Sequence, residues 1–155
     1  GVFSTEYLDR LPLILKRKGA QNIMTVRSDD GMDEFSTSAT NRVCILKNDK
    51  VLMNAINPEV VGLHKSKLKD IQIQTKKDAI KSFVGVLNNT ANQAMIETTA
   101  LNAAGGLIVS NISKNFEEGV ELALNTIKEG KAFNLLEKFI AHTGDISKLK
   151  ELANG

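Results

Sequence analysis

The chain is organised around one acidic stretch, VRSDDGMDEFS at residues 26–36, which lies between two apolar runs typical of strands. Four carboxylates fall within residues 29–34, and the last two, Asp33 and Glu34, directly follow Gly31 and Met32. Glycine adopts φ > 0 without steric cost, which favours a tight turn at this point. We therefore expect a loop that turns Asp33 and Glu34 out of the end of a sheet.

These carboxylates have two interpretations. A hard cation such as Mg²⁺ commonly takes one or two carboxylates and completes its shell with water and phosphate oxygens, so an adjacent acidic pair suits it. The alternative is a solvated turn between two strands, in which Asp29, Asp30, Asp33 and Glu34 simply face water. Spacing alone leaves both open.

The elements around the stretch predict an α/β fold. Residues 1–4 resemble the end of a strand, and residues 22–26 form a second apolar run. Between them, Ser4 is expected to cap a helix with apolar positions at helical spacing: Leu8, Leu11, Ile14 and Leu15. Strand, helix and strand in this order predict a βαβ unit and a mainly parallel sheet. Ligands of such folds bind beyond the carboxyl ends of strands, which favours a functional acidic loop.

The rest of the chain predicts a hairpin followed by a helical half. Residues 42–47 and 51–56 are strand-like runs joined at Asn48-Asp49-Lys50, and residues 59–74 predict a polar connection with at most a short helical turn. Helices are expected after the caps Thr75 and Asn115, over residues 93–109, over 131–141 and at the C-terminal end. The small residues of 93–109 would let another backbone approach closely.

Composition predicts one globular domain over residues 1–155. The apolar fraction of 42% and the charged fraction of 25% are ordinary for globular proteins. A net charge of +2 gives no field that would favour nucleic acid or a membrane surface. A single cysteine, Cys44, excludes an internal disulfide, and no apolar run approaches the roughly 20 residues of a membrane helix. We therefore expect a cytoplasmic protein with no nucleic-acid or membrane partner.

Other chemically suggestive residues favour structural roles. Cys44 could pair with His64 or His142 as nucleophile and base, but its place in a strand pattern favours a buried structural thiol, and the isolated histidines lack the spacing of metal ligands. Gly105-Gly106 lies inside a helical pattern, which favours packing over phosphate binding. The basic triplet at residues 16–18 fits the solvated end of a helix.

The order of these motifs resembles the C-terminal part of the anthranilate phosphoribosyltransferases, members of the nucleoside phosphorylase/phosphoribosyltransferase family. The resemblance extends to about residue 140. The matching stretches are GVFS at 1–4, GMDEFS at 31–36, residues 58–63, Asn102-Ala103-Ala104, EEGVELA at 117–123 and GKA at 130–132.

The resemblance implies an activity in tryptophan biosynthesis. Members of the family move phosphoribosyl from phosphoribosyl pyrophosphate to anthranilate, and their Gly-[Leu/Met/Val]-Asp-Glu motif holds magnesium against the diphosphate leaving group. That role would fall to Asp33 and Glu34. A cation held by carboxylates would stabilise charge on the departing diphosphate.

The sequence also departs from the family pattern. Arg27-Ser28 stands where a His-Gly or His-Ser pair is usual, so Arg27 is either a phosphate contact or a surface arginine, and Ala39-Thr40 replaces a common Gly-Pro pair. The family's phosphate loop and anthranilate-binding arginine have no counterpart here. We therefore expect a fragment without the N-terminal helical domain and the first part of the α/β domain, inactive by itself.

Two alternatives stay open at the level of sequence. One is a related pyrimidine nucleoside phosphorylase, and the other is a non-catalytic binding or assembly domain on the same fold. An uncovered sheet edge or helix face could also drive formation of a homo-oligomer.

Overall fold

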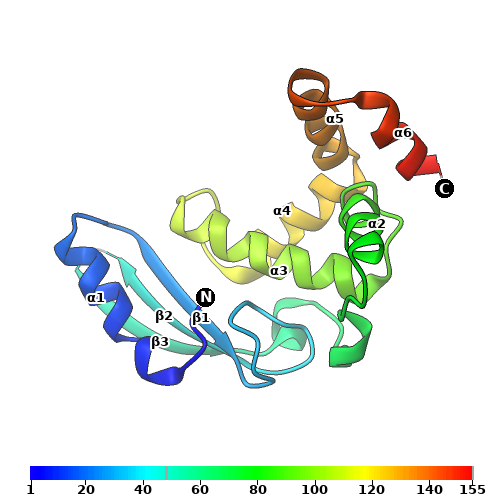
Figure 1. The fold of residues 1–155 in the computed structure, drawn as a ribbon. Coiled ribbons are helices and arrows are strands. Elements are labelled where there is room, and N and C mark those ends of the chain that lie inside the picture. The colour runs from blue at the N-terminus through cyan, green and yellow to red at the C-terminus, as the bar shows by residue number, and fades with distance from the viewer. Residues whose placement is uncertain (48, 155) are drawn as a thin grey trace.

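The computed structural model describes residues 1–47 and 49–154 and shows an α/β fold with a helical extension (Figure 1). Three strands pair in the order β1 (Ile23–Ser28), β2 (Asn41–Lys47) and β3 (Lys50–Ile56). Helix α1 (Arg10–Arg17) follows a 3₁₀ turn, η1 (Thr5–Tyr7), and packs on one face of the sheet. Helix α3 (Gln93–Val109) packs on the other face, so the sheet is the middle of three layers.

The remaining elements connect and extend these layers. They are η2 (Pro58–Val61), η3 (Leu68–Asp70), α2 (Lys76–Leu87), α4 (Phe116–Lys128), α5 (Lys131–Thr143) and α6 (Ile146–Asn154). Helix α4 packs along α3, whereas α2, α5 and α6 pack on one another away from the sheet (Figure 1). Among the described helices, none is both long and apolar enough to cross a membrane.

The α/β class is confirmed, but the expected mainly parallel sheet is wrong for the described residues. Both strand pairs are antiparallel, and Ser28 at the end of β1 lies opposite Asn41 at the start of β2. The loop between them closes on itself, with the backbone N–H of Asp29 donating to the carbonyl of Thr40 at 2.9 Å. A parallel neighbour would need a crossover to the opposite end of β1. Residues 1–4 form no strand, although the N–H of Val2 donates to the carbonyl of Val26 at 2.9 Å.

Neighbouring positions of β1 and β2 face different layers. Val26 lies opposite Val43, and both belong to the core beneath α3. Thr25 lies opposite Cys44, and its hydroxyl donates to the carbonyl of Leu8, between η1 and α1. Cys44 is fully buried in this second cluster, and burial, reinforced by the negative charge of Asp9, raises the pKa of its thiol. The prediction of a buried structural thiol is confirmed.

The predicted hairpin and most helices are confirmed, whereas the cap at Ser4 is wrong. The strands β2 and β3 form the hairpin. Asn48, which lies between them in the sequence, is outside the described residues. Asn115 accepts from the N–H of Glu118 at 2.9 Å, as a capping residue should. Ser4 makes no capping bond, and α1 begins only at Arg10. Pro12 explains this start, because proline is tolerated only in the first turn of a helix.

Small residues let α3 approach its neighbours closely. A Cβ atom at Gly105 would lie 2.9 Å from the ring of Phe35 and 3.3 Å from the sulfur of Met24. On α4, a Cβ atom at Gly119 would lie 2.9 Å from that of Ala104. Gly106 has open space instead, with nothing within 4 Å of such an atom. The packing interpretation therefore holds for Gly105.

The neighbouring glycines Gly105 and Gly106 should respond oppositely to alanine. Gly106→Ala should stabilise the fold by about 1 kcal/mol, because alanine is the better helix former and meets no neighbour there. Gly105→Ala should destabilise it by about 1–3 kcal/mol, because the methyl group would displace the buried Phe35 ring. Chemical denaturation of both variants measures the difference, and equal effects would contradict the packing described for α3.

Candidate metal site on the acidic loop

The acidic loop, residues 29–40, leaves the carboxyl end of β1 and returns to β2. Its tip is a tight turn, in which Gly31 has φ 101° and the N–H of Ser28 donates to the carbonyl of Met32 at 2.9 Å. The side chain of Asp30 accepts from the N–H of Met32 at 3.0 Å. The predicted role of Gly31 in a turn is therefore confirmed. Because the sheet is antiparallel, however, this loop does not lie at an edge where the carboxyl ends of parallel strands meet.

Two of the four acidic side chains are bonded within the protein. Arg42 donates to both carboxylate oxygens of Asp29, at 2.7 and 3.1 Å. Asp30 also accepts from the hydroxyl of Ser38. Burial raises the pKa of Asp30, but its interactions with the hydroxyls of Ser36 and Ser38 and with the loop backbone outweigh burial and lower the pKa below its ordinary value. These two carboxylates hold the loop together.

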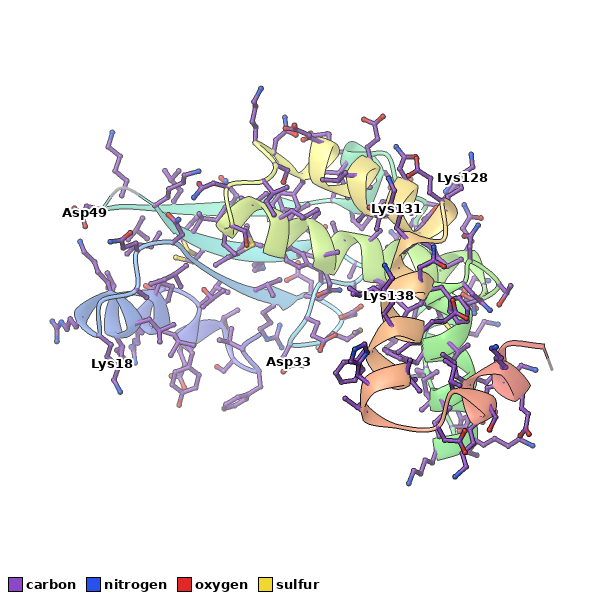
Figure 2. The ribbon with its side chains drawn as sticks, turned by 90° about the horizontal axis from the view of Figure 1, so that it is seen from above. Lys18, Asp33, Asp49, Lys128, Lys131 and Lys138 are labelled. Carbon is purple, nitrogen blue, oxygen red and sulfur yellow. The ribbon has the colours of Figure 1, made fainter. Side chains whose placement is uncertain are left out.

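Asp33 and Glu34 differ from this pair. Both are exposed, and among the described residues neither side chain has a hydrogen-bond or ion-pair partner. Figure 2 shows Asp33 at the end of the sheet opposite to Asp49. Glu34 also borders a largely apolar cavity of about 310 Å³ between α2 and α3. Asp29 and Asp30 are thus bonded to other groups of the loop and of β2, whereas Asp33 and Glu34 are available to a ligand.

The donor set of Asp33 and Glu34 fits a hard cation only in part. Carboxylate oxygens are the ligands that Mg²⁺ prefers, and a single site commonly uses one or two of them. In the described part of the chain, no group of three or more histidine, cysteine or acidic side chains could hold a metal ion. A cation at this loop would therefore need water or substrate oxygens for the rest of its shell.

Two asparagines hold the segment directly after the carboxylates. Asn102, on α3, accepts from the N–H of Phe35 at 3.1 Å and donates to the carbonyl of Phe35 at 2.8 Å. Asn41, on β2, makes the same pair of bonds to Ser36, at 2.8 and 2.9 Å. The sequence pattern predicts neither role. One local feature of the sequence points to these two residues, because asparagine is unfavourable inside both helices and strands.

Further contacts extend this support to the segment after η2. The hydroxyl of Thr37 lies 2.7 Å from that of Thr98 on α3 and 2.8 Å from that of Ser66. The N–H of Ser66 donates to the carbonyl of Thr37 at 3.0 Å. The loop is therefore hydrogen-bonded to β2, to α3 and to Ser66, and these bonds fix the path of its backbone.

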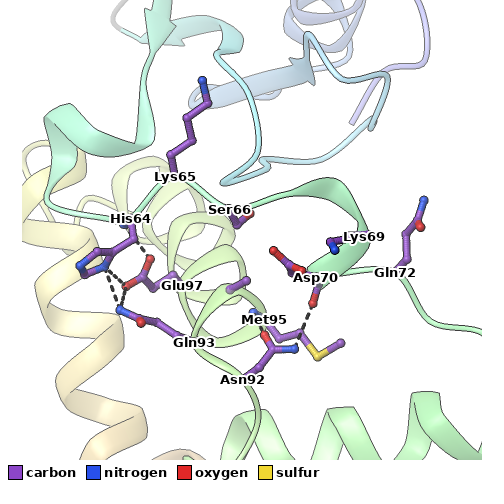
Figure 3. Close-up of a pocket in the computed structure, with 11 residues that line it drawn as sticks. His64, Lys65, Ser66, Lys69, Asp70, Gln72, Asn92, Gln93, Met95 and Glu97 are labelled. Carbon is purple, nitrogen blue, oxygen red and sulfur yellow. Dashed lines mark hydrogen bonds and ion pairs between the residues drawn. The ribbon is translucent and has the colours of Figure 1, made fainter.

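A separate polar pocket of about 590 Å³ lies between the segment 64–72 and the start of α3 (Figure 3). Glu97 is buried there and accepts from the backbone N–H of His64 and from Gln93, both at 2.8 Å, while the ring Nδ1 of His64 lies 2.7 Å from it. Folding thus brings His64 beside Glu97, a residue 33 positions away in the sequence. These contacts tie the segment to α3.

The remaining candidates do not join the acidic pair. His142 lies one helical turn from the carbonyl of Lys138, with which its Nδ1 interacts at 2.9 Å, and Cys44 is in the cluster beneath α1. The guanidinium of Arg27 donates to the carbonyls of Phe3 and Ser28, each at 3.0 Å. Arg27 thus holds residues 1–4 against β1, and a phosphate contact by this residue stays a prediction.

These features accompany a clear family relationship. Residues 1–133 match a family described as glycosyl transferase family, a/b domain, and the chain belongs to this family. Its relatives include proteins named anthranilate phosphoribosyltransferase. The chain is 87% identical over 155 residues to that of Nitrosopumilus maritimus (strain SCM1), covering 100% of this chain and 44% of the relative. It is 44% identical over 151 residues to that of Cenarchaeum symbiosum (strain A), covering 97% of this chain and 44% of the relative.

Solved structures with this fold carry the same name. Anthranilate phosphoribosyltransferase from Thermus thermophilus superimposes with a TM-score of 0.82 at 28% identity, over 91% of this chain and 41% of that one. The Saccharomyces cerevisiae enzyme in complex with PRPP and Mg shares the fold with a TM-score of 0.76 at 22% identity, over 96% of this chain and 42% of that one. The chain therefore spans less than half the length of these relatives.

The hydrogen bonds of Asp30 predict a dependence of stability on pH. Because the folded state lowers the pKa of this carboxyl, its stabilisation is present above the unfolded pKa, about 3.9, and is lost as the pH falls through the folded value. Asp30→Asn should therefore be less stable than the parent at pH 7, and the difference should shrink below about pH 4. Thermal unfolding of both proteins from pH 7 to pH 3 tests this, and a constant difference would contradict it.

Proposed function

We propose that this chain is part of an anthranilate phosphoribosyltransferase, which transfers phosphoribosyl from phosphoribosyl pyrophosphate to anthranilate in tryptophan biosynthesis. The 87% identity to the Nitrosopumilus maritimus relative extends over all 155 residues and supports this assignment. In this proposal, segments outside the 155 residues supply the rest of the active site. The proposal includes a cytoplasmic location, with which the free thiol of Cys44 is compatible.

Within this function, Asp33 and Glu34 supply carboxylate ligands to Mg²⁺. The observation that carries the proposal is their lack of partners among the described residues, beside two acidic residues that are fully engaged. Unpaired, exposed carboxylates on an anchored loop are available to a cation without first breaking an ion pair. Asp29 and Asp30 would lose existing bonds if they turned to the same cation.

The cation and the two carboxylates would have different roles in the transfer. A bound Mg²⁺ supplies positive charge to the diphosphate leaving group. Asp33 and Glu34 hold and orient that charge, and their own negative charge makes the loop unfavourable for a diphosphate in the absence of a cation. The turn at Gly31 and the bonds of Asp30 keep the two carboxylates at the end of β1.

The test uses a chimeric enzyme in which residues 1–155 replace the matching segment of the Nitrosopumilus maritimus relative. Asp33→Asn and Glu34→Gln, numbered as in this chain, keep the size of each side chain but remove its charge. Each should lower turnover by about 100-fold and raise the Mg²⁺ concentration needed for half-maximal activity, because a ligand is lost. Steady-state assays of anthranilate consumption at varied Mg²⁺ measure both effects.

Asp49→Asn is the matched control for these variants. Asp49 is an exposed acidic residue paired with Lys16 at 2.7 Å, at the other end of the sheet. A surface ion pair contributes little, so activity and Mg²⁺ dependence should stay at the parent values. If Asp33→Asn and Glu34→Gln behaved like this control, the two residues would have no metal-binding role.

The isolated chain of 155 residues should not catalyse the transfer. Asp33 and Glu34 provide only part of a cation's shell, and among the described residues no third acidic or histidine ligand joins them. Incubation with anthranilate, phosphoribosyl pyrophosphate and Mg²⁺ should leave anthranilate fluorescence unchanged, whereas the chimeric enzyme should consume it. Turnover by the isolated chain would show that it contains a complete site.

A further inference from the structure

We propose that Asn102 is a positioning residue for the metal carboxylates, which acts by fixing the backbone directly after Glu34. The inference rests on the proposed function, because it assigns a role toward the cation that Asp33 and Glu34 would bind. Asn102 does not itself reach the cation in this assignment. It sets the direction in which the two carboxylates leave the end of the sheet.

One of the two bonds between Asn102 and Phe35 acts on the peptide that joins Glu34 to Phe35, and the other acts on the next peptide. The N–H of Phe35 belongs to the first of these planar units and donates to Asn102 at 3.1 Å, while the carbonyl of Phe35 accepts from the same amide at 2.8 Å. Two bonds from one side-chain amide hold Phe35 in the way that a neighbouring strand would. Fixing the Glu34–Phe35 peptide plane removes rotational freedom immediately beside Glu34.

Asn102 is suited to this role because its own position is fixed. Its amide nitrogen also donates to the carbonyl of Thr98, one turn earlier on α3, at 2.9 Å. The adjacent residue Leu101 and the nearby Ala104 are completely buried in the core. A side chain on a packed helix holds a ligand group more rigidly than one on a second loop would.

The position of Asn102 also sets it apart from the other supports of the loop. Asn41 bonds to Ser36, one residue further from the carboxylates, and also donates to the carbonyl of Ala39 at 3.2 Å, so it shapes the return to β2. Thr98 contacts Thr37, further still along the loop. Among the described side chains, Asn102 is the one bonded to the backbone of the residue next to Glu34.

The experiment compares Asn102→Ala with Asn92→Ala in the chimeric enzyme defined above. Asn92 caps the same helix, accepting from the N–H of Met95 at 2.9 Å, and has no bond to the acidic loop. Both variants should lower the melting temperature, because each removes bonds made by α3. Affinity for Mn²⁺, an oxygen-preferring cation, is measured by electron paramagnetic resonance with saturating inorganic diphosphate present.

Asn102→Ala should weaken Mn²⁺ binding about 10-fold, the usual effect of removing a group that orients a metal ligand, whereas Asn92→Ala should leave it unchanged. The half-saturating Mg²⁺ concentration for transfer should rise in parallel. If Asn102→Ala does not fold, Asn102→Ser serves instead, because its side chain adds no charge and is too short to make both bonds to Phe35. It should weaken Mn²⁺ binding as well.

Mn²⁺ affinity within twofold of the parent in a folded Asn102 variant would overturn the inference and leave a role in stability only. If Asp33→Asn and Glu34→Gln weaken Mn²⁺ binding in the same assay, the proposed metal site survives and this inference alone fails. If those two variants also bind Mn²⁺ as the parent does, the proposed metal site fails and the inference fails with it.

Discussion

The buried ring of Phe35 is the contact on which the position of the acidic loop depends. Phe35 is 3% exposed, and its ring meets that of Phe116 edge to face with centroids 5.3 Å apart. It fits there only because Gly105 has no side chain, since a Cβ atom would lie 2.9 Å from the ring. An apolar anchor thus stands directly after two exposed carboxylates. The hydrophobic core therefore holds Phe35, which directly follows Asp33 and Glu34.

The four acidic residues of the loop form two pairs with different surroundings. Asp29 and Asp30 are matched by Arg42, Ser38 and a backbone N–H, so their charges stabilise the turn. Asp33 and Glu34 have no such partners among the described residues and face outward. The bonds of Asp29 and Asp30 fix the turn that precedes Asp33 and Glu34.

Helix α3 links this loop to the rest of the molecule. Its buried face carries small residues toward the sheet and α4, and its polar positions hold backbone groups of neighbouring segments. Glu97 accepts a hydrogen bond from the N–H of His64, and Asn102 accepts one from the N–H of Phe35. Buried polar groups of this kind require partners, and backbone N–H groups of loops require acceptors. The helix therefore holds the acidic loop, on which the proposed function depends, and the segment that begins at His64.

The sequence by itself determined the local elements, because helix caps, hydrophobic spacing and turn residues act within a few positions. It predicted the α/β class, the hairpin, the span of α3, the turn at Gly31 and the buried thiol of Cys44. Only the tertiary structure decided that the sheet is antiparallel, that two of four acids are engaged, and that Asn102 holds Phe35. These outcomes depend on contacts between residues up to 67 positions apart, which local patterns do not encode.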